Sequence, residues 1–288
     1  MRARDLVDDA ERTLIESPSV DHWQRGRERI EAEELLEFVL GRAPEDDDQV
    51  PAAARRRYER LVSRRTTGEP VPHIMGFMEF RGLRLKVRRT VFVPRDSSEW
   101  MVEQAVRRIR RRATPVAVDL ATGAGPIALA VSNEVRRAEV YGTDLTRDAV
   151  ALSRENARAL KLPARFVRGD LFSGLPARLA GRVDLITFHP PYLGRREIRE
   201  LPDEIRNFEP LSSLTDQSPT GMFLIERAAE ESEEWLRPGG WFLLEVAPDR
   251  SRAVTSLLRR HGFRDVRSTK EPGGGIVADA SRVIVARG

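Results

Sequence analysis

The tetrapeptide His189-Pro190-Pro191-Tyr192 directly follows an apolar run at residues 183–188. Two prolines end a buried strand, because proline lacks the N–H that the strand ladder needs and its ring fixes φ. In an open α/β sheet, ligands bind at the carboxyl ends of the strands. The tetrapeptide therefore predicts an active-site turn in which an imidazole, a rigid carbonyl group and an aromatic ring come together.

A second candidate site lies in residues 116–126, which are typical of a strand, a glycine-rich turn and a helix start. Gly123 and Gly125 let the backbone pass close to a ligand, and Pro126 suits a first helical position. A carboxylate at Asp119 would repel phosphate groups. The turn therefore favours a cationic, amino-acid-like ligand, such as the methionine part of S-adenosylmethionine, over a diphosphate.

Two further acidic residues follow the next two predicted strands. Asp144 ends the segment 139–144, where a carboxylate can accept hydrogen bonds from both ribose hydroxyls. Asp170 follows the segment 164–169, where it can receive an adenine amino group. Each acid alone is also typical of an ordinary strand-end loop. Three acids at the ends of three successive strands, together with the glycine turn, predict a nucleoside-containing cofactor.

These residues need a sheet that positions them, and the alternation of strands and helices after residue 116 predicts a parallel, doubly wound α/β sheet. We expect strands at residues 116–120, 139–144, 164–169, 183–188, 240–246, 264–268 and 281–286, and helices at 126–135, 147–160, 220–236 and 250–261. The last two strands are too close together for a long crossover helix. They predict an antiparallel hairpin at the end of the sheet.

The sequence before this sheet predicts a separate helical part and a hairpin. Residues 1–70 carry apolar side chains at helical spacing and end at Gly68-Glu69-Pro70. A β-hairpin is predicted at about residues 76–87, where apolar and polar residues alternate. We therefore expect three domains, at 1–70, 71–97 and 98–288.

The composition is that of a globular protein, with 33% charged and 40% hydrophobic residues. No apolar run reaches the roughly 18 residues that span a bilayer, and the N-terminus lacks the apolar core of a signal peptide. The chain has no cysteine, which excludes disulfides and thiolate chemistry. Its four histidines show no paired metal-ligand spacing. We expect a cytoplasmic protein with no membrane partner and no metal.

The net charge of +4 raises the question of a nucleic-acid partner. Arginine supplies nearly all the positive charge, which is typical of a codon bias. The basic clusters at 55–57 and 107–112 favour solvated helix faces over an RNA-facing or ribosome-facing patch. We therefore do not expect nucleic acid as a partner.

Several motifs occur together in one order along the chain. They are Val93-Pro94-Arg95-x-x-Ser98-Glu99, Asp119-x-x-x-Gly123-x-Gly125, Asp144, Asp170, Pro190-Pro191-Tyr192, Phe208-Glu209-Pro210, Gly221, Pro238-Gly239-Gly240 and Glu245. With them the chain resembles, over nearly its whole length, the HemK/PrmC family of class I S-adenosylmethionine-dependent methyltransferases. That family methylates the glutamine side-chain amide of peptide-chain release factors.

The resemblance implies an α/β fold with a seven-stranded Rossmann-like sheet whose last strand is antiparallel. It also implies an N-terminal helical substrate-recognition domain (1–70), a β-hairpin linker (71–97) and a catalytic domain (98–288) that binds S-adenosyl-L-methionine. Cofactor contacts are implied for Asp119, Ala121, Thr122, Gly123, Gly125, Asp144, Leu145, Asp170, Leu171 and His189.

The resemblance also implies roles for the turn at 189–192. In the family, the first residue and the carbonyl group of the second accept hydrogen bonds from the target nitrogen, which here implies catalytic roles for His189 and Pro190. Tyr192 would pack on the planar group of the substrate. Substrate contacts are implied for Arg95, Ser98, Glu99, Pro191 and Tyr192. Glu245, near the end of the fifth predicted strand, is expected to be structural.

The substrate half departs from the family pattern. The family has Asn where this chain has His189, and a neutral imidazole offers one donor and one acceptor in a different geometry. The ring can accept from a nitrogen, act as a general base, or lie behind the substrate as a hydrogen-bonded support. Ser98 replaces a favoured Thr, and the stretch 215–221 lacks the second glycine and the acidic residue that the family has before Gly221.

These departures leave four functions open. In the first, the protein methylates a release-factor glutamine. In the second, it N- or O-methylates a small molecule or modified peptide in specialised metabolism. A third alternative is a protein that binds the cofactor without methylating an amide. The fourth is a methyltransferase for rRNA or tRNA bases. The sequence makes no prediction about oligomeric state.

Overall fold

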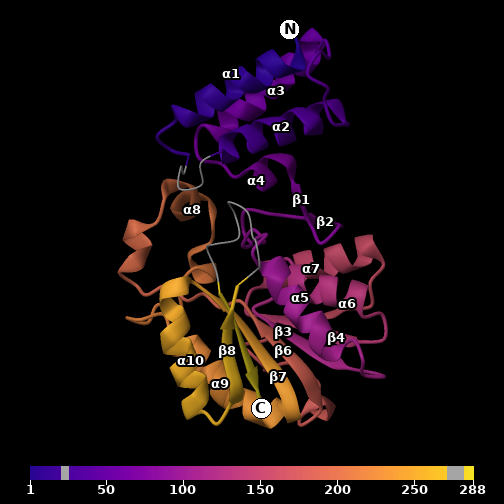
Figure 1. Ribbon diagram of the computed structural model, residues 1–288, viewed down its shortest axis with the longest axis vertical. Helices are drawn as coiled ribbons and strands as arrows, with labels where there is room; N and C mark the ends of the chain where they lie inside the picture. Colours follow the sequence, from indigo (N-terminus) through magenta and orange to yellow (C-terminus); the bar gives the residue numbers. More distant parts are fainter. Residues whose placement is uncertain (21–25, 271–281) are drawn as a thin grey trace. The chain divides into compact units, whose positions relative to one another are not determined.

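The computed structural model describes residues 1–20, 26–270 and 282–288 (Figure 1). Contacts between Cα atoms divide the chain into two compact units. The helical unit comprises residues 1–78 and 199–209, and the sheet unit comprises residues 79–198 and 210–288. In the described part of the chain, no helix combines the length and the apolar character needed to cross a membrane.

The helical unit is built on amphipathic helices. They are α1 (Ala3–Ile15), α2 (Arg27–Leu40), α3 (Ala52–Arg65), α4 (Val71–Met75) and α8 (Asp203–Phe208). Leu14 of α1, Leu35 of α2 and Val62 of α3 lie in one buried cluster, so the apolar stripes of these helices face each other. The segment 199–209 belongs to this unit, whereas the sequence-based division places it in the catalytic domain. The functional boundaries at 70 and 97 stay a prediction.

A buried ionic network joins the early helices of this unit to the later segment. Arg65 is 0% exposed. Its Nε donates to Glu31 at 2.7 Å and its Nη2 donates to Glu204 at 2.8 Å. The guanidinium group therefore connects α2, α3 and α8, which lie far apart in the sequence.

The predicted hairpin is present. Strands β1 (Phe77–Phe80) and β2 (Leu83–Lys86) form a two-stranded sheet. The turn between them contains Arg81 at φ 51° and Gly82 at φ 70°. A left-handed turn of this kind fits the right-handed twist of a hairpin.

The sheet unit contains the seven-stranded sheet, in the order β5-β4-β3-β6-β7-β9-β8. Its strands are β3 (Val116–Leu120), β4 (Glu139–Asp144), β5 (Arg165–Arg168), β6 (Val183–Phe188), β7 (Leu236–Val246), β8 (Arg264–Thr269) and β9 (Arg282–Arg287). β9 is antiparallel to both neighbours, which confirms the predicted C-terminal hairpin. β7 begins four residues earlier than the predicted 240, and residue 281 of the predicted last strand lies outside the described residues.

Helices cover both faces of this sheet (Figure 1). They are α5 (Ser98–Ile109), α6 (Pro126–Glu134) and α7 (Arg147–Leu160) on one face, and α9 (Phe223–Trp235) and α10 (Ser251–Arg260) on the other. The loops also contain short 3-10 turns, η1 (Ala177–Leu179), η2 (Glu197–Glu200), η3 (Leu211–Ser213) and η4 (Pro248–Arg250). Along β3, Ala117 packs in the cluster of the first face and Val118 in that of the second. This period of two is the one expected for a strand buried on both faces.

The strand order reverses at β3, which has β4 on one side and β6 on the other. In open α/β sheets the crevice for ligands lies outside the carboxyl ends of the strands at such a reversal. The fold therefore brings the glycine turn after β3 and the proline turn after β6 to the same edge.

Candidate active site

The candidate site lies at the carboxyl ends of β3, β4, β6 and β7. β3 and β6 pair in parallel with Asp119 opposite Thr187 and Leu120 opposite Phe188. The register places the two turns that follow these strands side by side. The sequence predicts each turn separately at a strand end, and the sheet brings the two turns together.

The glycine turn after β3 has a left-handed backbone at three positions. Ala121, Gly123 and Gly125 have φ of 50°, 56° and 87°. A Cβ on Gly125 would lie 3.0 Å from the ring of Phe166, and a Cβ on Gly142 would lie 2.5 Å from the same ring. Ala121 holds a backbone conformation that L residues rarely adopt, which is typical of functional turns.

Asp119, on β3, stabilises this turn through hydrogen bonds to its side chain. Its side chain accepts hydrogen bonds from the hydroxyl groups of Thr122 at 2.6 Å and Thr187 at 2.7 Å. Burial raises the pKa of Asp119 to about 6, although both hydroxyl groups act in the opposite direction. The carboxyl group therefore joins β3, the glycine turn and β6. Its predicted contact with a cationic ligand stays a prediction.

Asp144 connects the end of β4 to the same turn. It accepts from the backbone N–H of Gly123 at 3.0 Å, and from the N–H and hydroxyl group of Thr146 at 2.9 Å each. Leu145 follows it with 61% of its surface exposed. A half-exposed carboxylate beside an exposed apolar side chain suits a sugar and an attached planar ring.

The end of β5 shows a different environment for its acid. Asp170 is exposed and pairs with Arg227 of α9 at 3.0 Å. The next residue, Leu171, is buried and has φ of 49°. The predicted contact between Asp170 and an adenine amino group therefore competes with an ion pair.

The turn after β6 presents His189 between two aromatic rings. Its ring stacks with Tyr192 (centroids 6.0 Å apart, planes at 13°) and meets the edge of Phe92 (5.7 Å, 82°). Pro190 and Pro191 are buried. Burial raises the pKa of Tyr192 to about 12, so its hydroxyl group stays protonated at neutral pH.

A buried carboxyl group lies behind His189. The Nδ1 atom is 3.6 Å from Oε2 of Glu245 and 3.4 Å from Oγ of Ser98. Glu245 is 0% exposed, and its Oε1 accepts from the hydroxyl group of Ser97 at 2.8 Å. Burial lowers the pKa of His189 and Arg95 lowers it further, whereas Glu245 acts in the opposite direction.

Sequence reasoning missed the place of Glu245, Ser97 and Phe92 beside the catalytic turn. A signal was present for Glu245, because it is the next-to-last residue of the strand that follows β6 in the chain. Leu244 of β7 pairs with Phe188 of β6, so Glu245 lies one step further along the sheet, level with His189. Ser97 and Phe92 lie in an irregular segment, and no pattern in the sequence indicates where their side chains point.

The other predicted substrate residues divide into two groups. The guanidinium group of Arg95 lies over the ring of Phe92 at 4.4 Å, and Ser98 is 2% exposed beside His189. Glu99 instead accepts from the backbone N–H of Arg81 at 2.8 Å, so its carboxylate holds the hairpin turn.

The segment 214–221 supports the catalytic turn from the side. The N–H of Leu193 donates to the carbonyl group of Leu214 at 3.0 Å. Gly221 has φ of 69°, and a Cβ there would lie 2.0 Å from the carbonyl oxygen of Tyr192. The departures from the family pattern at 215–221 therefore lie directly against the turn.

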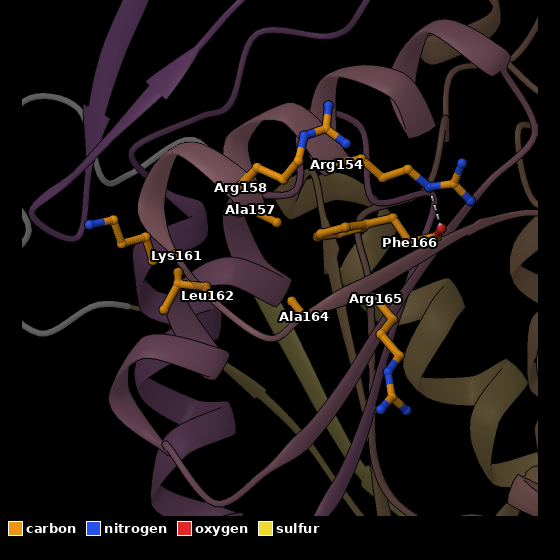
Figure 2. A pocket seen from close by; sticks show the side chains of 8 residues that line it. All are labelled: Arg154, Ala157, Arg158, Lys161, Leu162, Ala164, Arg165 and Phe166. Atoms are coloured by element: carbon orange, nitrogen blue, oxygen red, sulfur yellow. Dashed lines mark hydrogen bonds between the residues drawn. The ribbon is translucent and has the colours of Figure 1, made fainter.

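A separate pocket lies at the edge of the sheet, between the end of α7 and the start of β5. Figure 2 shows that the charged groups of Arg154, Arg158, Lys161 and Arg165 point in different directions. Arg154 uses its Nε to donate to the carbonyl group of Phe166 at 2.8 Å. The four cations do not converge on one point, and the pocket lies at the amino end of β5, opposite the edge where the candidate site lies.

Comparisons with known proteins match both parts of the chain. Residues 22–76 match the PrmC N-terminal domain, and residues 97–201 match the methyltransferase small domain. The release factor glutamine methyltransferase of Bordetella pertussis is 36% identical over 254 residues, which cover 86% of this chain and 93% of that protein. The enzyme of the same name from Deinococcus radiodurans is 31% identical, and the match covers 92% of each chain.

Solved structures show the same fold at low sequence identity. A methyltransferase from Pyrococcus furiosus has a TM-score of 0.53 at 16% identity, covering 72% of this chain and 89% of that one. The catalytic domain of hMettl16, solved with an RNA hairpin, has a TM-score of 0.59 at 13% identity, covering 77% of this chain and 81% of that one. The likeness to both concerns the fold alone.

Proposed function

The chain belongs to the PrmC/HemK family of S-adenosylmethionine-dependent methyltransferases, and from this premise we propose that it methylates the glutamine side-chain amide of a peptide-chain release factor. The observation that carries the proposal is the extent of the match. Release factor glutamine methyltransferases at 36% and 31% identity align with this chain over 93% and 92% of their own length. The acceptor would be a protein of the translation machinery, which would place the reaction in the cytoplasm.

The residues at the ends of β3 and β4 fit the cofactor of this family. The turn from Ala121 to Gly125 offers backbone without large side chains, and Asp144 offers acceptor oxygens beside the exposed side chain of Leu145. We assign cofactor contacts to Asp119, Ala121, Thr122, Gly123, Gly125, Asp144, Leu145, Asp170, Leu171 and His189. The cofactor supplies a methyl group on a positively charged sulfur, which is already activated for displacement.

The protein's own task is then to place the acceptor nitrogen. His189 has Nδ1 toward Ser98 and Glu245, which leaves Nε2 to accept a hydrogen bond from the substrate. The carbonyl group of Pro190 offers a second acceptor, and the ring of Tyr192 offers a flat surface for an amide group. Two acceptors fix the direction of an NH₂ group, and such positioning can supply much of a rate enhancement.

Substrate contacts are assigned to Arg95, Ser98, Glu99, Pro191 and Tyr192. Of these, Glu99 is bonded to the hairpin turn, so it would act through the position of the hairpin. The N-terminal residues that match the PrmC domain would recognise the release factor.

A second candidate function is methylation of a different acceptor, either a small molecule or a modified peptide. It is favoured by His189, which replaces the family's Asn, and by the altered loop at 215–221 against the turn. A histidine base can also deprotonate a hydroxyl group or an amine, which an asparagine cannot do.

The deciding experiment is incubation with methyl-labelled S-adenosylmethionine and a release factor. We expect label on the glutamine of its Gly-Gly-Gln loop, located by mass spectrometry of the digested product. The same release factor with that glutamine replaced by asparagine is the control and should stay unlabelled. If calorimetry shows cofactor binding and the release factor stays unlabelled, the proposed acceptor is wrong. The His189→Asn variant then reports whether the first residue of the turn alone changes the acceptor.

A further inference from the structure

Glu245 combines complete burial with an unused acceptor atom. Its side chain is 0% exposed, and among the described residues its Oε2 has no hydrogen-bond partner. A buried polar atom without a partner costs about 1–3 kcal/mol, so such an atom needs an explanation. The other oxygen, Oε1, accepts from the hydroxyl group of Ser97 and is held in place.

The unused oxygen faces the catalytic turn. Oε2 lies 3.6 Å from Nδ1 of His189, and Oγ of Ser98 lies 3.4 Å from the same nitrogen. The rings of Phe92 and Tyr192 confine the imidazole, one by its edge and the other by its face. Two oxygen atoms therefore meet one ring nitrogen, and the ring has little freedom to turn away from them.

We propose that Glu245 is a positioning residue that keeps the proton of neutral His189 on Nδ1, so that Nε2 accepts a proton from the acceptor nitrogen. The inference rests on the proposed methyl transfer to a nitrogen and goes beyond it, because it gives His189 a base function that an asparagine cannot have. Ser98 supports the same tautomer by accepting from Nδ1–H, as a hydroxyl group can.

The proton balance of the transfer gives this pair a task. One nitrogen–carbon bond forms and one sulfur–carbon bond breaks, with its electron pair staying on sulfur. The amide nitrogen then carries one hydrogen too many, and this hydrogen leaves as a proton to Nε2 of His189. The resulting imidazolium lies against the negative charge of Glu245 until water removes the proton.

The groups around the ring determine how this base depends on pH. Glu245 from β7 favours the charged ring, whereas burial and Arg95, from the segment before α5, favour the neutral ring. Tyr192 of the same turn stays neutral, because its pKa is raised to about 12. Burial has the largest effect, so the pKa of His189 lies below its usual value and Nε2 is free to accept at neutral pH. Methyl transfer is then lost as pH falls through this pKa.

NMR of the whole protein with ¹⁵N-labelled histidine tests the proposal without any substrate. The His189 signals are identified by their loss in His189→Asn. We expect the Nδ1–H tautomer in the wild type, and in Glu245→Gln a mixture of tautomers with a pKa lowered by about one pH unit. Ser97→Ala should instead raise the pKa of His189. The carboxylate of Glu245 then loses a hydrogen-bond donor and interacts more strongly with the charged imidazolium. Glu233→Gln, an exposed position on α9, is the matched control and should change nothing.

Kinetics complete the test. Glu245→Gln should lower kcat about tenfold with little change in KM and in cofactor affinity measured by calorimetry. The inference is overturned if the tautomer and pKa of His189 are unchanged in both Glu245→Gln and Ser97→Ala. It is also overturned if Glu245→Gln weakens only cofactor binding. Absence of any release-factor methylation would instead contradict the proposed function, and the NMR result would stand apart from it.

Discussion

At the scale of single residues, two buried carboxyl groups support the two turns of the site in different ways. Each oxygen of Asp119 accepts from a hydroxyl group, whereas one oxygen of Glu245 has no hydrogen-bond partner among the described residues and lies beside His189. A carboxyl group that accepts a hydrogen bond on each oxygen holds the backbone of its neighbours in place. A carboxyl group with one oxygen free of hydrogen bonds can interact with a ring that gains and loses a proton. This difference in hydrogen bonding is the reason to assign Asp119 a structural role and Glu245 a role in positioning His189.

Asp119 makes stability depend on pH. Its pKa is raised from 3.8 to about 6, so its contribution to stability is fully present below about pH 4 and is lost as pH rises through about 6. A shift of this size corresponds to about 3 kcal/mol. Asp119→Asn cannot ionise, so the free energy of unfolding of the variant relative to the wild type should rise by about 3 kcal/mol between pH 4 and pH 8. Denaturant unfolding without cofactor measures this, and a pH-independent difference would contradict it.

At the scale of elements, the catalytic turn depends on the loop beside it. Leu193 pairs with Leu214, and the backbone of Gly221 lies against the carbonyl group of Tyr192. A loop without regular structure can hold a site rigidly when its backbone bonds and close contacts are made, as they are here. The altered sequence at 215–221 can therefore change which acceptor fits without any change in the sheet.

Gly221→Ala tests this support. A Cβ there would lie 2.0 Å from the carbonyl oxygen of Tyr192, so the turn must shift. We expect methyl transfer to fall at least about tenfold while cofactor affinity stays within about twofold, because the cofactor side lies on β3 and β4. The matched control is Gly181→Ala, which has a similar φ of 65° and where a Cβ would meet no atom of the described residues within 4 Å. It should cost only about 1 kcal/mol of stability and leave transfer unchanged. Equal transfer by both variants would show that the loop does not position the turn.

At the scale of the whole molecule, the helical unit is discontinuous in sequence. It takes residues 199–209 from a point after the catalytic turn, and the buried Arg65 binds Glu204 of that segment as well as Glu31. The two ends of 199–209 both lead into the sheet unit. Arg65 therefore binds a segment that the chain connects to the catalytic turn before it and to the loop 214–221 after it.

Arg65→Met should remove the buried guanidinium group that binds both Glu31 and Glu204, leaving Arg27 as the cation beside the two carboxyl groups. Removing one side of a buried ion pair typically costs about 3–5 kcal/mol. We expect a loss of stability of that order in denaturant unfolding, with faster proteolysis within 199–209. Arg56→Met, at an exposed position of the same helix, should behave like the wild type. Wild-type stability in Arg65→Met would show that the network contributes nothing.

Local patterns along the sequence suffice to predict the strands, the helices and the edge of the sheet that carries the site. Strands buried on both faces read as apolar runs, and prolines and glycines mark their ends, so Gly123, Asp144 and the turn from His189 to Tyr192 could be placed at strand ends. Those signals are local. The order of motifs along the chain then sufficed for the family, which the relatives confirm.

The contacts between side chains that are distant in the sequence depend instead on the tertiary fold. The contacts of Glu245 with His189, of Glu99 with the hairpin and of Arg65 with Glu204 join positions between 18 and 139 residues apart. Side-chain partners at such separations depend on strand register and helix packing, which no local period encodes. The sequence shows that His189 stands where the family has an asparagine. That the buried carboxyl group of Glu245 lies behind this histidine can be seen in the structure alone.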